Sequence, residues 1–216
     1  MIVLVAGTGT EVGKTWVAAR LATELRARGR TVAARKPAQS YAPGTGPTDA
    51  EVLAAASGED PHRVCPPHRW LPLAAAPPMA AALLGRPGFG IADLAGELAP
   101  LPGRRVAIIE GVGGPRSPLA DDGDTVDLAA SLDADAVLLV AEAGLGAINA
   151  VRLAAAAFAR VAPVVVLLNR YDPVDRLHPA NLAWLRERCG LDVLVEPADL
   201  AARLTGTPSP LPMEAL

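Results

Sequence analysis

The sequence predicts an α/β fold in which a doubly wound, mostly parallel sheet lies between two layers of helices. Its apolar runs are continuous rather than alternating, as in strands that are buried on both faces. These runs alternate with Ala-rich helical segments, an order typical of parallel strands joined by right-handed crossovers. Hydrophobic residues make up 51% of the chain but aromatic residues only 3%, so Val, Leu, Ile and Ala must build the core. A single-domain, Rossmann-like three-layer αβα structure is therefore expected.

The strands are assigned to the apolar runs in order along the chain. They cover residues 1–6, 31–35, 106–109, 136–140, 164–168 and 193–195. After the first run, Val17, Leu21 and Leu25 recur at helical spacing, and Gly29 is typical of a residue that ends a helix. Further helices are expected at residues 91–99, 147–161 and 179–188.

A capping box predicts one more helix. Thr48 is suited to the N-cap and Glu51 to the third helical position, and Gly58 can end the helix. The segment before it, Pro37–Pro47, is rich in Pro, Gly, Ser and Thr and is expected to form a loop at the end of a strand, where chemistry is often located.

The 216 residues are enough for one well-buried domain and few for two. We assign the domain to residues 1–204 and expect a loosely packed tail over residues 205–216. The proline-dense stretch Pro61–Pro78 is expected to be an irregular surface excursion within the domain.

Charge and cysteine content restrict the partners. The net charge is −3, and the sequence has no basic stripe that could follow a phosphodiester backbone or anionic lipid, so nucleic acid and membrane surfaces are not expected partners. Cys65 and Cys189 lie far apart in sequence and are expected to be reduced thiols in the cytoplasm. Small molecules are the expected partners.

The strongest chemical signal is the glycine-rich segment Gly7–Thr15, GTGTEVGKT, between the first strand and the first helix. Backbone N–H groups of such a loop bind phosphate oxygens, Lys14 can reach the outer phosphates, and the Thr15 hydroxyl can bind Mg²⁺. The usual pattern has glycine where this chain has Thr8. A glycine-rich turn with an accidental GKT is the alternative.

Acidic and basic residues follow other predicted strands. Glu110 ends the run 106–109, at the edge where ligands bind in open parallel sheets, and could bind Mg²⁺. Gly111 and Gly113 would allow a phosphate or substrate to approach the backbone. Lys36 ends the second strand and could stabilise charge on a transferring phosphoryl group.

Each assignment also has a structural alternative. Glu110 and Lys36 could be solvated residues at strand ends. Asp49 could be present because the helix dipole favours an acid in the first turn, and not because it binds metal. The Asn169 amide could bind an adenine edge or belong to a turn.

Several of these motifs, taken in order, resemble the dethiobiotin synthase family over most of the chain. The segment 7–15 is similar to that family's lengthened P-loop, which accounts for Thr8. Lys36-Pro37-Ala38-Gln39-Ser40 resembles its Lys-Pro substrate loop, and Asp49 matches its metal-binding Asp. Residues 110–114, EGVGG, and 144–149, GLGAIN, are similar to two further segments of the family.

The resemblance implies a role for each matching residue. It implies catalytic roles for Lys36, Lys14 and Thr10, and Mg²⁺ binding by Thr15, Asp49 and Glu110. It implies ATP binding by Glu11, Val12, Gly13, Lys14, Thr15, Trp16, Asp49, Glu110, Gly111, Val112 and Gly113, with Asn169, Arg170 and Pro197 near adenine. Ser40 would contact the substrate, and Gly146 and Asn149 would contribute to its carboxylate site across a homodimer interface.

The implied reaction converts 7,8-diaminononanoate, CO2 and ATP into a cyclic urea, through a carbamate that ATP phosphorylates. The chain departs from the family pattern on the substrate side. Tyr41 stands where glycine is usual, Ala150 where histidine is common, and Arg116-Ser117-Pro118 replaces a more apolar turn. These changes crowd or recharge the substrate side more than the ATP side.

Three alternatives remain on the sequence alone. The first is an amidating synthase of corrin biosynthesis, whose glutaminase domain is missing from this chain. The second is a ParA/MinD-like ATPase switch, whose additional early P-loop lysine is absent from residues 7–13. The third is a paralogue that binds nucleotide but has an altered substrate.

Overall fold

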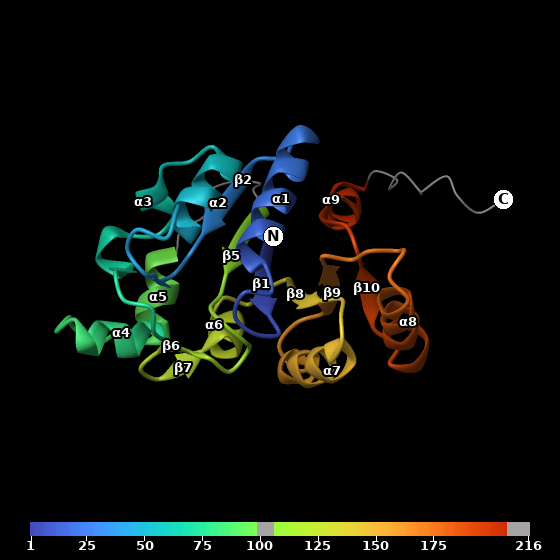
Figure 1. The fold of residues 1–216 in the computed structure, drawn as a ribbon. Helices are drawn as coiled ribbons and strands as arrows, with labels where there is room; N and C mark the ends of the chain where they lie inside the picture. Colours follow the sequence, from blue (N-terminus) through green and yellow to red (C-terminus); the bar gives the residue numbers. More distant parts are fainter. Residues whose placement is uncertain (99–105, 207–216) are drawn as a thin grey trace.

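The computed structural model describes residues 1–98 and 106–206. Its centre is a six-stranded sheet in the order β10-β9-β8-β1-β5-β2 (Figure 1). The strands are β1 (Ile2–Gly7), β2 (Val32–Arg35), β5 (Val106–Glu110), β8 (Ala136–Glu142), β9 (Val164–Asn169) and β10 (Asp192–Leu194). Every pairing in this sheet is parallel. The predicted fold class is confirmed, and each predicted strand is found within two residues of its expected bounds.

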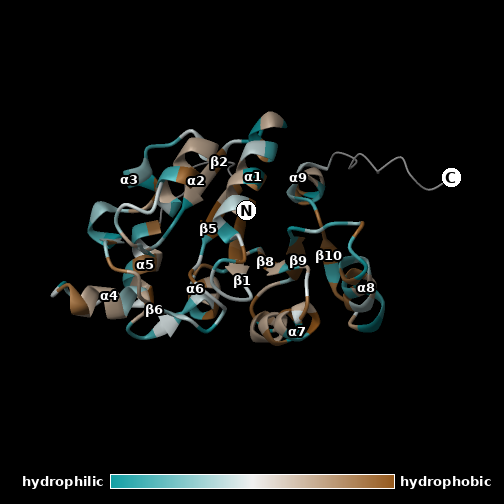
Figure 2. Ribbon diagram, viewed as in Figure 1, coloured by the Kyte–Doolittle hydropathy of each residue, from teal (hydrophilic) through white to brown (hydrophobic). Residues whose placement is uncertain are grey.

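Helices cover both faces of the sheet. One layer holds α1 (Lys14–Ala27), α2 (Asp49–Ser57) and α9 (Pro197–Thr205). The other holds α5 (Ile91–Leu98), α6 (Thr125–Ser131), α7 (Ala147–Phe158), α8 (Leu177–Ala183) and the π-helical turn η2 (Trp184–Arg188). Side chains of β1 alternate between the layers, because Val3 and Val5 join the α1 core while Leu4 and Ala6 join the α7 core. Figure 2 shows that the strands of the sheet are largely hydrophobic, whereas the helices mix hydrophobic and hydrophilic residues.

The order in which the chain adds strands to the sheet reverses next to β1. From β1 the chain moves to β2 at one edge, and later it moves through β8 and β9 to β10 at the other edge. In such sheets, ligands bind beyond the carboxyl ends of the strands near this reversal. Gly7 at the end of β1 and Glu110 at the end of β5 are therefore in the expected place for a site.

The expectation of an irregular stretch at Pro61–Pro78 is wrong. This stretch forms α3 (Pro61–Val64), the 3₁₀ turn η1 (Pro67–Arg69), β4 (Trp70–Leu71) and the start of α4 (Pro77–Leu83). Pro61, Pro67, Pro77 and Pro78 lie in the first turn of α3, η1 or α4, where the missing N–H has no helical partner to lose.

Short strands also form outside the main sheet. β3 (Gln39–Ser40), within the predicted loop, pairs with β4 in parallel, and β6 (Pro118–Ala120) pairs antiparallel with β7 (Gly123–Asp124). Of the predicted tail, Thr205 ends α9 and Gly206 follows it; residues 207–216 lie outside the described residues. None of the helices in residues 1–98 and 106–206 has the length and apolar character needed to cross a membrane.

Candidate active site

The glycine-rich loop connects β1 to α1, and its last turn rests on β9. Gly13 precedes α1 with a φ of 90°, a conformation that favours glycine. A Cβ atom at Gly13 would lie 2.1 Å from Nδ2 of Asn169, the last residue of β9. The same Nδ2 donates a hydrogen bond to the carbonyl oxygen of Val12 at 2.9 Å. The sheet therefore fixes the loop through Asn169, and only glycine leaves room for that contact.

The side chain of Lys14 lies against the glycine-rich loop. Its Nζ donates to the carbonyl oxygen of Gly9 at 2.8 Å, and its side chain is largely buried. Burial, together with the positive charge of Lys36, lowers the pKa of Lys14 from 10.5 to about 8. An anion in the loop would counteract both effects and raise the pKa of Lys14. Phosphate in the loop would therefore favour the charged form of this lysine.

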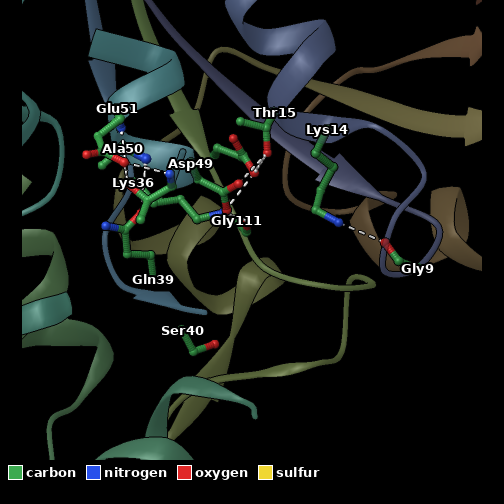
Figure 3. Close-up of polar contacts among 12 residues, drawn as sticks. Gly9, Lys14, Thr15, Lys36, Gln39, Ser40, Asp49, Ala50, Glu51 and Gly111 are labelled. Carbon is green, nitrogen blue, oxygen red and sulfur yellow. Dashed lines mark hydrogen bonds and ion pairs between the residues drawn. The ribbon is translucent and has the colours of Figure 1, made fainter. Parts of the chain in front are cut away.

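Three oxygen-bearing side chains meet beside the start of α1. Thr15 Oγ1 lies 2.8 Å from Asp49 Oδ1 and 2.9 Å from Glu110 Oε1 (Figure 3). A hydroxyl has one proton and can donate to only one of these oxygens. Glu110 is buried, and among the described residues its Oε2 has no hydrogen-bond partner. Apart from Lys36, which is described below, these three side chains thus have more acceptors than donors, as expected of a site for a cation.

These three side chains suit Mg²⁺, which also binds water and phosphate, better than they suit a metal ion whose ligands all come from the protein. Within the described residues, no group of three or more His, Cys, Asp or Glu side chains could hold a metal ion. Mg²⁺ prefers oxygen ligands and usually keeps several waters, with one or two carboxylates and substrate phosphates completing its shell. Two carboxylates and one hydroxyl next to a glycine-rich loop match that requirement.

Lys36 lies between the two carboxylates. Its Nζ is 2.7 Å from Asp49 Oδ2 and 2.7 Å from Glu110 Oε1, and it donates to the carbonyl oxygen of Gly111 at 3.1 Å. Burial alone would lower the pKa of Lys36, but Glu110 and Asp49 outweigh burial and raise it above its ordinary value. Lys36 also lowers the pKa of Asp49, against the effect of burial. Lys36 is therefore a fixed cation at the bottom of the site.

One pocket of about 1000 Å³ joins these groups. The predicted site residues that line it are Thr10, Glu11, Gly13, Lys14, Thr15, Lys36, Ser40, Asp49, Glu110, Val112, Gly113 and Arg170. Its volume is in the range of pockets that bind small molecules and cofactors.

Other predicted site residues lie outside this pocket. Trp16 is 56% exposed on α1, and Pro197 begins α9, which packs against α1. Gly146 and Asn149 are exposed at the start of α7. Asn169 contacts the glycine-rich loop through its hydrogen bond to Val12. The next residue, Arg170, donates to the carbonyl oxygen of Glu11. Their proposed roles in binding stay predictions.

The pocket also has wall residues that are not among the predicted site residues. They include Gln39, Ser117, Pro118 and the segment 74–77. Ser40 Oγ donates to the carbonyl oxygen of Ala75 at 2.5 Å, which ties this segment to the Lys-Pro loop. Gln39 could have been noticed from its place in that loop. The segment 74–77 contains only Ala and Pro, so it carries no chemical signal in the sequence.

Comparisons with known proteins agree with the resemblance in sequence. The AAA domain family matches residues 2–196. The chain is 39% identical over 209 residues to the ATP-dependent dethiobiotin synthetase BioD of Anaeromyxobacter sp. (strain K), covering 92% of both chains. It is 40% identical over 169 residues to the BioD of Corynebacterium efficiens, covering 77% of this chain and 73% of the relative.

Solved structures of other proteins share the fold. A cobyrinic acid a,c-diamide synthase from Mycobacterium smegmatis, with a bound ATP analog and magnesium, has a TM-score of 0.55 at 19% identity and covers 94% of this chain and 91% of its own. A putative plasmid partition protein from Borrelia burgdorferi B31, bound to AMPPNP, has a TM-score of 0.54 at 11% identity, with 99% and 92% covered. At such identities the likeness extends to the fold alone, whereas the curated relatives match in sequence over most of the chain. This protein belongs to the dethiobiotin synthetase family, within the AAA domain family.

Proposed function

We propose that this chain is an ATP-dependent dethiobiotin synthase, which forms the ureido ring from 7,8-diaminononanoate and CO2 with Mg²⁺ as cofactor and releases ADP and phosphate. The observation that carries the proposal is the convergence of Lys14, Lys36, Thr15, Asp49 and Glu110 on one pocket that continues past Ser40. This arrangement provides a phosphate side and a substrate side in one cavity.

The P-loop forms the nucleotide side. Its backbone N–H groups and the N-terminus of α1 suit the phosphates of ATP. Thr15, Asp49 and Glu110 would hold Mg²⁺, which when bound would neutralise charge on the phosphate oxygens. Arg170 lies at the pocket wall, beside Glu11, where adenine or ribose would reach.

The two lysines stabilise the charge that moves during phosphoryl transfer. One amine of the diamine adds to CO2, loses a proton and gives a carbamate. A carbamate oxygen then attacks the γ-phosphorus of ATP, forming a mixed anhydride and ADP. The second amine attacks the carbamate carbon, loses a proton and expels phosphate. Lys14 and Lys36, held by Gly9 and by the two carboxylates, place fixed positive charge where negative charge develops.

The substrate side is lined by small apolar residues and a few polar ones. Ala74, Ala75 and Pro77 suit the aliphatic chain of a diamine acid, and Ser40 offers a hydroxyl. Tyr41 also lines the pocket, with its ring edge-on to Trp70 at a centroid distance of 6.3 Å. This bulky ring lies at the substrate wall, so it affects which substrate fits more than which nucleotide fits. An altered substrate is therefore the second candidate.

We also propose a homodimer in which the start of α7 completes the substrate site of the partner. Gly146 and Asn149 lie outside the pocket of their own chain, and Leu145 is 94% exposed. Asn149 and Leu153 are four residues apart on α7 and so share an exposed face. A cytoplasmic location stays a prediction.

The test is phosphate release by the purified protein with Mg-ATP and bicarbonate, with and without 7,8-diaminononanoate. We expect release that requires both the diamine and bicarbonate, and a product with the mass of the cyclic urea. Tight ATP binding without diamine-dependent release would contradict the synthase and favour an altered substrate or an ATPase switch.

A further inference from the structure

Gln39 is a buried polar residue in the Lys-Pro loop, and its amide has one defined orientation. It is only 2% exposed, and its Oε1 accepts a hydrogen bond from the backbone N–H of Ala50 at 3.0 Å (Figure 3). A backbone N–H can only donate, so the oxygen of the amide must face Ala50. Nε2 then points elsewhere and has no hydrogen-bond partner within the described residues.

This hydrogen bond reaches the first turn of the helix that carries Asp49. The first N–H groups of a helix have no partner within it. In α2, Glu51 N–H is capped by Thr48, which directly precedes the helix. Gln39 belongs to a different segment, β3, so its bond joins α2 to the loop that follows Lys36.

The Gln39 bond does not occupy either oxygen of the Asp49 carboxylate. Lys36 also holds Asp49, but it does so through the carboxylate oxygen Oδ2. A bound Mg²⁺ would compete with Lys36 for that oxygen. Gln39 holds the backbone at the next residue, Ala50, and touches neither carboxylate oxygen. It can therefore keep Asp49 within reach of Thr15 in both the metal-free and the metal-bound site.

We propose that Gln39 is a positioning residue that holds Asp49 through the Ala50 backbone and thereby sets the Mg²⁺ affinity of the site, an inference that rests on the proposed function. Partners that orient metal ligands typically change metal affinity by about 10–100-fold when they are removed. The acceptor oxygen carries the effect, while the unpartnered Nε2 does not.

The experiment measures the affinity of the full chain for mant-ADP, a fluorescent nucleotide, with and without Mg²⁺. Gln39→Met keeps the length of the side chain and removes the acceptor. We expect it to reduce the Mg²⁺-dependent gain in affinity by about tenfold, with little change in Mg²⁺-free affinity. Gln39→Glu retains an acceptor near a helix N-terminus, where an acid is favoured, and should keep the gain of the wild type.

Thr48→Ala is the matched control, because it removes a cap of the same helix turn without breaking the link to the Lys-Pro loop. It should lower the melting temperature and keep the Mg²⁺ gain. A normal Mg²⁺ gain in Gln39→Met, or an equal loss in Thr48→Ala or Gln39→Glu, would overturn the role of Gln39 alone. If the affinity of the wild-type protein for mant-ADP is the same with and without Mg²⁺, the proposed function is overturned as well.

Discussion

At the scale of single residues, the proposed role of Lys36 in turnover can be separated from its contribution to stability. It is 3% exposed and bonded to two carboxylates in the pocket. We expect Lys36→Met to lower kcat by about 10²–10³-fold, as for removal of one group that stabilises transition-state charge, with a much smaller change in KM for ATP. Steady-state phosphate release measures both.

The neighbouring residue offers a matched control. Arg35 is also buried and forms an ion pair with Glu59 at 2.9 Å, but it does not line the pocket. Arg35→Met should therefore lower the melting temperature and leave kcat close to that of the wild type. Similar losses of kcat in both variants would mean that Lys36 acts only through stability.

Lys14 should make the nucleotide-free protein less stable at neutral pH. Its pKa is lowered from 10.5 to about 8, first by burial and then by Lys36. Between pH 8 and 10.5 the unfolded chain binds more protons at this residue, so its contribution to stability rises with pH. Lys14→Met should melt at a higher temperature than the wild type at pH 7, and this advantage should shrink toward pH 10.

Thermal denaturation of both proteins from pH 7 to 10, without nucleotide, checks this expectation. The difference between them removes the titration of other groups. An advantage that stays constant or grows with pH would contradict the burial of a charged Lys14.

At the scale of elements, the last turn of the P-loop depends on its contact with β9. Gly13 and Gly29 both have positive φ, of 90° and 75°, but only at Gly13 would a Cβ meet another residue, Asn169. Gly29→Ala should cost roughly 1–2 kcal/mol for its backbone conformation alone. Gly13→Ala should cost more and should abolish nucleotide binding, because Asn169 or the loop must move.

Urea denaturation and nucleotide binding measure these two effects. A double-mutant cycle isolates the contact, since Gly13→Ala should cost less in an Asn169→Ala background than in the wild type. Equal costs in the two backgrounds would show that the clash with Asn169 is relieved without strain.

At the scale of the whole molecule, the proposed dimer can be tested by mixing inactive variants. If Asn149 serves the partner's site, Lys36→Met mixed with Asn149→Ala restores one intact site in each mixed dimer. Random exchange would make half of the dimers mixed, so activity should recover to about a quarter of the wild type. Sedimentation measures the oligomeric state of each sample.

A mixture of Lys36→Met with Lys14→Met is the control, because both residues line the pocket of one chain. It should not recover activity. Recovery in the control, or none in the first mixture, would contradict a site shared between subunits.

Local sequence determined much of this protein. The apolar runs are buried strands because a parallel sheet covered on both faces has no polar side, and the capping box at Thr48 does start α2. The order of strand, GTGTEVGKT and helix is a local signal, and it is found as expected. Lys36 follows β2 and Glu110 ends β5, so the sequence places each of them at the carboxyl edge of the sheet, whereas the pairing of these two strands is a feature of the tertiary structure.

Only the tertiary structure decided which distant residues meet. The distance of 2.9 Å between Asn169 and Val12, the bond of Gln39 to Ala50 and the pocket wall at residues 74–77 all depend on how separate segments pack. The prolines of Pro61–Pro78 suggested irregular structure, yet the chain uses three of them to begin helical turns. Side-chain type and spacing specify the elements, because their hydrogen bonds are local. The geometry of the site depends on long-range packing, which no short stretch of sequence contains.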